Sequence, residues 1–405
     1  MTLFLIGPFI GAVVTALFGR WRRVAALCGL LTAVILWLLL RLEPAARQSG
    51  TLFGSVLVFT PEIRTLFLFL YAGLAVLFAL ALVSPQGVPQ GGKLVPASLA
   101  AFGFLALALL ARPFLIGAFF LAMGLALLTV AIQDDRAGSV QGGLRYLVVT
   151  VFALPFLLGA AWLADTQTAA AGESIGRVAL WGGLILLAAF PFHVWATTIV
   201  REASPLAWLL VFGLAQLVVT LFVFSLMGGG VNGEMARLVE FTAVLTLLVA
   251  LLLLLTAVTL RRLVGGLLLA DMAGVALLLV ANPALRGETA VTIHMARFFS
   301  LVFIAVALQM WQPFGGALTA AGETDDQRRS QGMARRAPLT TLVLLVGCLS
   351  LAGLPLTLGF GGRWLVINLL LASDSTILAL LLLATMGAGV LALLRAMPYW
   401  LAWHP

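Results

Sequence analysis

Ionisable side chains within long apolar stretches are the residues of this 405-residue chain that could do chemistry. They include Asp271, His294, Arg297 and Arg363. A charge in a hydrocarbon environment is costly, so such residues usually pair with one another and mark a path for ions or protons. His294 is the best candidate for proton transfer, because imidazole changes its protonation near neutral pH. Arg363 stays protonated, so it can hold a carboxylate but is a poor relay.

These side chains also have plainer interpretations, and the sequence does not choose among them. His294 could lie at the end of its helix, in contact with water and without a role in transport. Asp271 could cap a water-filled cavity or form an ion pair. Its possible partners are Arg261, Arg262 and Arg297.

The sequence shows no site of the kind that an enzyme carries. It has no CxxC pair, no Cys/His cluster, no phosphate-binding glycine loop and no Ser/His/Asp arrangement. We therefore expect no catalytic residue, no cofactor and no metal. The formal charge of +8 suggests a nucleic-acid-binding protein, but the basic residues stand singly or in pairs at the ends of apolar runs. That placement is typical of signals for membrane topology, so no nucleic-acid partner is expected.

The composition indicates that a membrane surrounds these residues. Hydrophobic residues make up 63% of the chain and charged residues 9%, whereas soluble domains are about half apolar and about a quarter charged. A helix needs about 20 apolar residues to cross a bilayer. The apolar runs predict an all-α polytopic membrane protein of about 13 transmembrane helices. The predicted spans are Leu3–Phe18, Val24–Leu42, Thr65–Ser84, Val95–Ala111, Pro113–Gln133, Leu144–Ala164, Val178–Val200, Ser204–Met227, Ala236–Leu260, Leu263–Ala281, Thr289–Gln312, Pro338–Ala372 and Thr376–Leu394.

The seventh and twelfth predicted helices are interrupted. Pro191 and His193 break the seventh, and Pro355 and Gly359 break the twelfth. Because five helices separate the breaks, helices four to eight and nine to thirteen would form two repeats, the second inverted in the membrane. Paired breaks of this kind indicate an ion path near the midplane, since the freed backbone groups need polar partners. The alternative is a pair of proline kinks that only shape packing, and His193 is expected to stabilise its break rather than relay protons.

The predicted organisation has four parts. They are an N-terminal three-helix segment (1–94), the first five-helix repeat (95–230), the second, inverted five-helix repeat (231–396) and a short C-terminal tail (397–405). The side reached after odd-numbered helices carries 14 basic residues and the other side 7. Basic residues concentrate on the cytoplasmic side. We therefore expect the N-terminus outside and the C-terminus in the cytoplasm.

Three motifs of this chain resemble those of the antiporter-like membrane subunits of respiratory complex I, Mrp-type cation antiporters and membrane-bound hydrogenases. They are FPFHVW at 190–195 with EASP at 202–205, RRL at 261–263 with ADMAG at 270–274, and SLAGLPLTLGF at 350–360 with RW at 363–364. They are ordered and correctly spaced over roughly residues 56–394. The family usually has a fourteenth span, so the chain is expected to be a degenerate and C-terminally short member.

The resemblance implies a line of intramembrane ionisable residues that carries protons, and this chain departs from that line in its first half. The family's Glu on the fifth helix falls near Ala122, and its Lys residues on the seventh and eighth helices fall at Leu186 and Gln216. The His pattern of the eleventh helix begins at His294, and the cation of the twelfth is Arg363. Titratable groups are therefore expected to remain only in the second half.

The function implied by the resemblance is that of an antiporter-like integral subunit of a multisubunit complex that translocates protons or cations. The relay is expected to be largely lost in the first half and at most partly kept in the second. The candidates for the remaining pathway are His294, Arg363, Asp271, Arg297 and Gln216. Two alternatives stay open, a purely structural scaffold and a stand-alone secondary transporter.

The resemblance also implies the partners and the location of the chain. Expected partners are other membrane subunits, the lipid bilayer, and protons or monovalent cations. Any redox reaction would belong to the partner subunits. The expected location is the bacterial inner (cytoplasmic) membrane.

Overall fold

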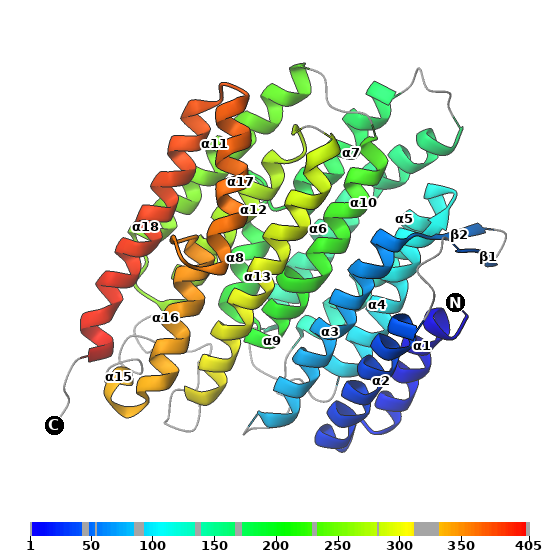
Figure 1. The fold of residues 1–405 in the computed structure, drawn as a ribbon, viewed down its shortest axis with the longest axis horizontal. Coiled ribbons are helices and arrows are strands. Elements are labelled where there is room, and N and C mark those ends of the chain that lie inside the picture. Colours follow the sequence, from blue (N-terminus) through cyan, green and yellow to red (C-terminus); the bar gives the residue numbers. More distant parts are fainter. Residues whose placement is uncertain are drawn as a thin grey trace.

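The computed structural model is a bundle of helices that run alongside one another, with the N-terminal helices at one end and the last helix at the other (Figure 1). It describes residues 2–42, 48–52, 55–84, 93–133, 139–166, 172–228, 233–281, 283–311 and 332–401. Within these ranges, eight helices are long and apolar enough to cross a membrane, and four shorter apolar helices accompany them. The predicted all-α polytopic fold is confirmed.

The N-terminal part consists of five helices and a small sheet. The helices are α1 (Thr2–Leu17), α2 (Arg22–Leu42), α3 (Pro61–Val83), α4 (Leu94–Leu110) and α5 (Phe114–Ile132). Strands β1 (Gln48–Leu52) and β2 (Ser55–Phe59) form an antiparallel hairpin between α2 and α3, and β2 also pairs with β3 (Ala111–Arg112). Alternate side chains of β2 are buried, as a half-buried strand requires. The sheet therefore ties the α2–α3 connection to the start of α5.

The described residues that follow α5 form helices and the short connections between them. The helices are α6 (Ser139–Thr166), α7 (Gly172–Leu186), α8 (Val194–Glu202), α9 (Pro205–Trp208), the π-helix η2 (Leu209–Ala215), α10 (Gln216–Met227), α11 (Gly233–Leu255), α12 (Leu260–Leu277), α13 (Pro283–Trp311), α15 (Met333–Arg336), α16 (Pro338–Ala352), α17 (Leu358–Ala372) and α18 (Thr376–Leu401). Each predicted span coincides with a helix or with consecutive helical segments. The last helix continues beyond residue 397, where the tail is predicted to begin. The division into repeats and the number of crossings stay predictions.

The two predicted helix breaks are present. The seventh span is α7 and α8, separated by the segment around Pro191, and the twelfth is α16 and α17, separated by the segment around Pro355. Proline cannot continue the hydrogen-bond ladder of a helix, so each break leaves backbone carbonyls at the end of α7 and of α16 that need other donors.

The centre of the bundle is formed by α12 and by the continuous segment α9–η2–α10. Nearly every side chain of these elements is buried. Many large apolar side chains of α1, α2, α6 and α18 are exposed instead. An apolar exterior around a tightly packed interior is what a lipid solvent favours, because polar groups must then find partners inside.

Candidate functional site

Six polar side chains follow one another through the interior of the bundle, on helices α10, α12, α13 and α17. They are Gln216, Thr220, His294, Arg297, Asp271 and Arg363. Each is less than a tenth exposed. We refer to these six residues as the central polar chain.

Asp271 lies between two arginines. The Arg297 Nε donates a hydrogen bond to Asp271 Oδ2, and the Arg363 Nε lies 3.8 Å from Asp271 Oδ1. The partner that the sequence left open is therefore Arg297. Arg261 instead donates to the backbone carbonyls of Arg201 and Ala203, at the end of α8. Because a single carboxylate faces two guanidinium groups, the cluster keeps a net positive charge inside the bundle.

His294 is bonded on both sides of its ring. The Arg297 Nη1 lies 3.2 Å from His294 Nδ1, and the Thr220 Oγ1 lies 3.1 Å from His294 Nε2. A guanidinium has donors only, so Nδ1 must accept and Nε2 must carry the proton. The geometry thus selects a neutral imidazole in one tautomer. The side chain has no exposed surface, so it lies inside the bundle rather than at a wet helix end.

One end of the central polar chain reaches the break of the seventh span. The Thr220 hydroxyl donates to the backbone carbonyl of Gln216 at 2.8 Å, and the Gln216 amide Nε2 donates to the carbonyl of Leu186 at 2.8 Å. Leu186 is the last residue of α7, so its carbonyl has no partner within the helix. The Gln216 amide therefore caps the broken helix directly, where the resemblance implied a pair of lysines.

The other end reaches the break of the twelfth span. The Arg363 Nη2 donates to the carbonyl of Leu351, in the last turn of α16, at 2.7 Å. A cation at the C-terminal end of a helix also meets the negative end of the helix dipole favourably. The same break is fastened by Ser350, whose hydroxyl oxygen accepts from the Gly359 backbone N–H at 3.1 Å.

The central polar chain thus joins the end of α7 to the end of α16. It links the two broken helices, which lie far apart in the sequence, through four contacts between side chains and the hydrogen bond from Thr220 to the Gln216 backbone carbonyl. The stability of the breaks and the protonation of His294 therefore depend on the same connected set of hydrogen bonds and ion pairs.

The π-helix η2 supplies a further contact that the sequence did not reveal. The Phe212 carbonyl lies 3.4 Å from Arg297 Nη1. A π-helical turn is wider than an α-helical turn and is often found at functional sites, since it changes where backbone carbonyls point. Thr220 was also missed, although it lies four residues after Gln216 and hence on the same helix face.

Other predicted residues lie outside the central polar chain. His193 is in the break of the seventh span, where its ring stacks on Phe190 with centroids 5.8 Å apart. Pro191 and Pro355 lie in the two breaks, and Gly359 is in the first turn of α17. Among the described residues no group of three or more His, Cys, Asp or Glu side chains could hold a metal ion.

A comparison with protein families matches residues 114–388 to the family described as NADH:quinone oxidoreductase/Mrp antiporter, TM. Subunit N of the NADH-quinone oxidoreductase of Geobacter metallireducens is 28% identical over 95% of this chain and 84% of its own length. The corresponding subunit of Acinetobacter baumannii is 29% identical over 66% of this chain. That match spans 57% of the Acinetobacter subunit, so the chain covers little more than half of this relative.

Solved structures share the fold. A chain of respiratory complex I from Thermus thermophilus superimposes with a TM-score of 0.73 at 18% identity, covering 99% of this chain and 90% of the other. A chain of the archaeal membrane-bound sulfane sulfur reductase gives 0.76 at 16% identity, covering 100% and 71%. A chain of the Mrp complex from Dietzia gives 0.73 at 16% identity, covering 100% and 81%.

Proposed function

The chain belongs to the NADH:quinone oxidoreductase/Mrp antiporter membrane family, and we propose that it is a subunit of a larger complex. Within this chain, ion coupling is confined to the part of the central polar chain that runs from His294 to Arg363. The complex is an ion-translocating assembly of the bacterial inner membrane, and other membrane subunits are its partners. The observation that carries the proposal is the position of His294 between Arg297 and Thr220.

The direction in which a proton could leave His294 follows from its partners. The Thr220 hydroxyl already donates its proton to the Gln216 backbone carbonyl, and a carbonyl accepts a hydrogen bond without passing a proton on. Beyond it, Gln216 does not titrate and Leu186 is apolar. The first half of the molecule therefore lacks a continuation for proton transfer.

On the other side, His294 can take up a proton only when Arg297 moves. Arg297 Nη1 donates to the Nδ1 lone pair, so a proton arriving at Nδ1 forms the N–H bond as this hydrogen bond breaks. The imidazolium then repels the guanidinium, which has Asp271 and the Phe212 carbonyl as its other acceptors. Protonation of His294 is in this way coupled to the Asp271–Arg297 ion pair.

The test is proton pumping by the intact complex at matched expression. His294→Ala and Arg363→Ala are expected to impair pumping, whereas Gln216→Leu is expected to leave it in place. Thr292→Ala is the matched control, because Thr292 lies on the same helix outside the central polar chain, and its hydroxyl donates to the Glu288 backbone carbonyl one turn earlier. Loss of pumping in Gln216→Leu alone would place the pathway in the first half of the molecule and contradict the proposal.

A structural scaffold is the second candidate function, and one observation favours it. Both ends of the central polar chain cap the carbonyls of broken helices, at Leu186 and Leu351. If the complexes that assemble with the variants of His294 and Arg363 pump protons at the wild-type rate, the chain is a scaffold.

A further inference from the structure

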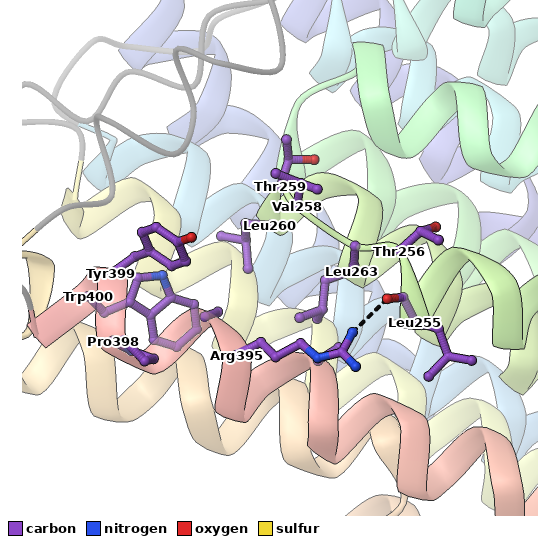
Figure 2. A pocket seen from close by; sticks show the side chains of 13 residues that line it. Leu255, Thr256, Val258, Thr259, Leu260, Leu263, Arg395, Pro398, Tyr399 and Trp400 are labelled. Carbon is purple, nitrogen blue, oxygen red and sulfur yellow. Dashed lines mark hydrogen bonds between the residues drawn. The ribbon is translucent and has the colours of Figure 1, made fainter.

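A cavity of about 730 Å³ opens at one end of the bundle, away from the central polar chain. Figure 2 shows that it lies between the last turns of α18 and the connection from α11 to α12. Arg395, Tyr399 and Trp400 line it from α18, and Leu255, Thr256 and Thr259 line it from the connection.

The helix lengths place this cavity at the boundary of the bilayer. From Thr376 to Arg395, α18 rises about 28 Å at about 1.5 Å per residue, and the hydrocarbon core of a bilayer is about 30 Å thick. The last turns of α18 therefore reach the headgroup region. Tyr399 and Trp400, which follow Arg395, are the residue types that concentrate at that depth.

The lining combines an apolar wall with a cation. Leu255, Trp400 and neighbouring aliphatic side chains form the wall. Arg395 is exposed, and its Nη1 donates to the Leu255 carbonyl at 2.6 Å, which uses one of the five N–H donors of the guanidinium. A phosphate oxygen is a preferred partner of such a group. None of the described residues that line the cavity carries a carboxylate.

Further positive charge lies next to the cavity. Arg262 follows the lining residues Thr259 and Leu260 in the first turn of α12. The short helix α15 ends in two exposed arginines, and its preceding residue Gly332 donates a backbone hydrogen bond to the Tyr399 carbonyl at 3.2 Å. These arginines are close neighbours of residues that line the cavity, and we expect them to add positive charge near its mouth.

We propose that this cavity binds one anionic glycerophospholipid, with its phosphate on Arg395 and its glycerol and upper acyl chain against the apolar wall. Basic pockets between membrane helices are suited to anionic headgroups. A free phosphate would leave the apolar wall without a partner, and a zwitterionic lipid would bring its own cation toward the basic mouth. This site is independent of the function proposed for the central polar chain.

The test uses the full chain in nanodiscs that contain phosphatidylglycerol and phosphatidylcholine, with retained lipid measured by native mass spectrometry. The wild-type chain is expected to retain phosphatidylglycerol in preference to phosphatidylcholine. Arg395→Gln keeps a donor for the Leu255 carbonyl but loses the charge. It should weaken retention about fivefold, since a basic residue near the surface contributes about 1 kcal/mol. Ala396→Phe should also reduce retention by filling the cavity while the charge remains.

Two controls keep the result interpretable. Arg23→Gln removes an exposed arginine near the start of α2, away from the cavity, and should retain lipid as the wild type does. Excess inorganic phosphate should not displace the lipid. Equal retention of both lipids, displacement by inorganic phosphate, or unchanged retention in both Arg395→Gln and Ala396→Phe would each overturn the proposal.

Discussion

At His294, hydrogen bonding and protonation can be separated by one substitution. A glutamine has an amide oxygen that can accept from Arg297 and an amide nitrogen that can donate to Thr220, so it can replace both contacts of the imidazole. It cannot bind a proton. We therefore expect His294→Gln to assemble and to unfold thermally close to the wild type, and yet to lose proton pumping. Pumping at the wild-type rate by this variant would show that His294 carries no proton.

The Asp271 carboxylate balances the buried positive charge of two arginines. Its removal should lower the free energy of unfolding more than removal of one of these arginines. Asp271→Asn leaves the guanidinium groups of Arg297 and Arg363 facing a neutral side chain. Breaking a buried ion pair in this way typically costs about 3–5 kcal/mol. Arg363→Met leaves the Asp271–Arg297 pair intact and removes the excess positive charge, so it should destabilise less, despite the lost cap on Leu351. Thermal unfolding of the full chain in detergent measures the stability of both variants. An equal drop in stability for Asp271→Asn and Arg363→Met would contradict the expected order.

Residue types identified part of this cluster, and spatial structure was needed for the rest. Asp271, His294, Arg297 and Arg363 stand out because charge is rare in apolar runs. The sequence does not determine whether Arg297 or Arg261 pairs with Asp271, because helix packings that bring either arginine next to Asp271 are conceivable. The Phe212 carbonyl was not predictable, since it takes part only through a π-helical turn.

At the scale of elements, the start of α17 depends on a close approach of two backbones. A Cβ atom on Gly359 would overlap the Ser350 carbonyl, a backbone group that cannot turn aside. Gly359→Ala should therefore open the break of the twelfth span and lower the amount of assembled complex. Gly361→Ala, in the same turn, would meet nothing within 4 Å, and alanine favours a helix over glycine by about 1 kcal/mol. A purification yield that is lower for Gly361→Ala than for Gly359→Ala would argue against this packing.

The helices were largely predictable from the sequence, whereas the small sheet was not. Proline and glycine mark both broken spans, and long apolar runs mark the others, because a bilayer permits few alternatives to a helix. The small sheet was not predicted. Strand β2 pairs with β1 in a hairpin and also with Ala111–Arg112, about fifty residues later in the chain, and this second contact leaves no local pattern.

At the scale of the whole molecule, the distribution of basic residues predicts how the chain is oriented in the membrane. Fourteen basic residues fall on the side reached after odd-numbered spans and seven on the other. Under this rule Arg336, just before α16, faces the cytoplasm. Ser373, between α17 and α18, lies one span later and faces outward. Both side chains are exposed, so both positions can report on accessibility.

Cysteine labelling in sealed inverted and right-side-out vesicles tests this orientation. The chain has two free cysteines, Cys28 and Cys348, of which Cys348 is buried, and both are first replaced by serine or alanine. A membrane-impermeant maleimide should then label Arg336→Cys only in inverted vesicles and Ser373→Cys only in right-side-out vesicles, because one broken span separates them. The reverse pattern would overturn the orientation but keep the span. Labelling of both positions from one side would mean that α16 and α17 do not cross the membrane together, which would also remove the basis for two inverted repeats.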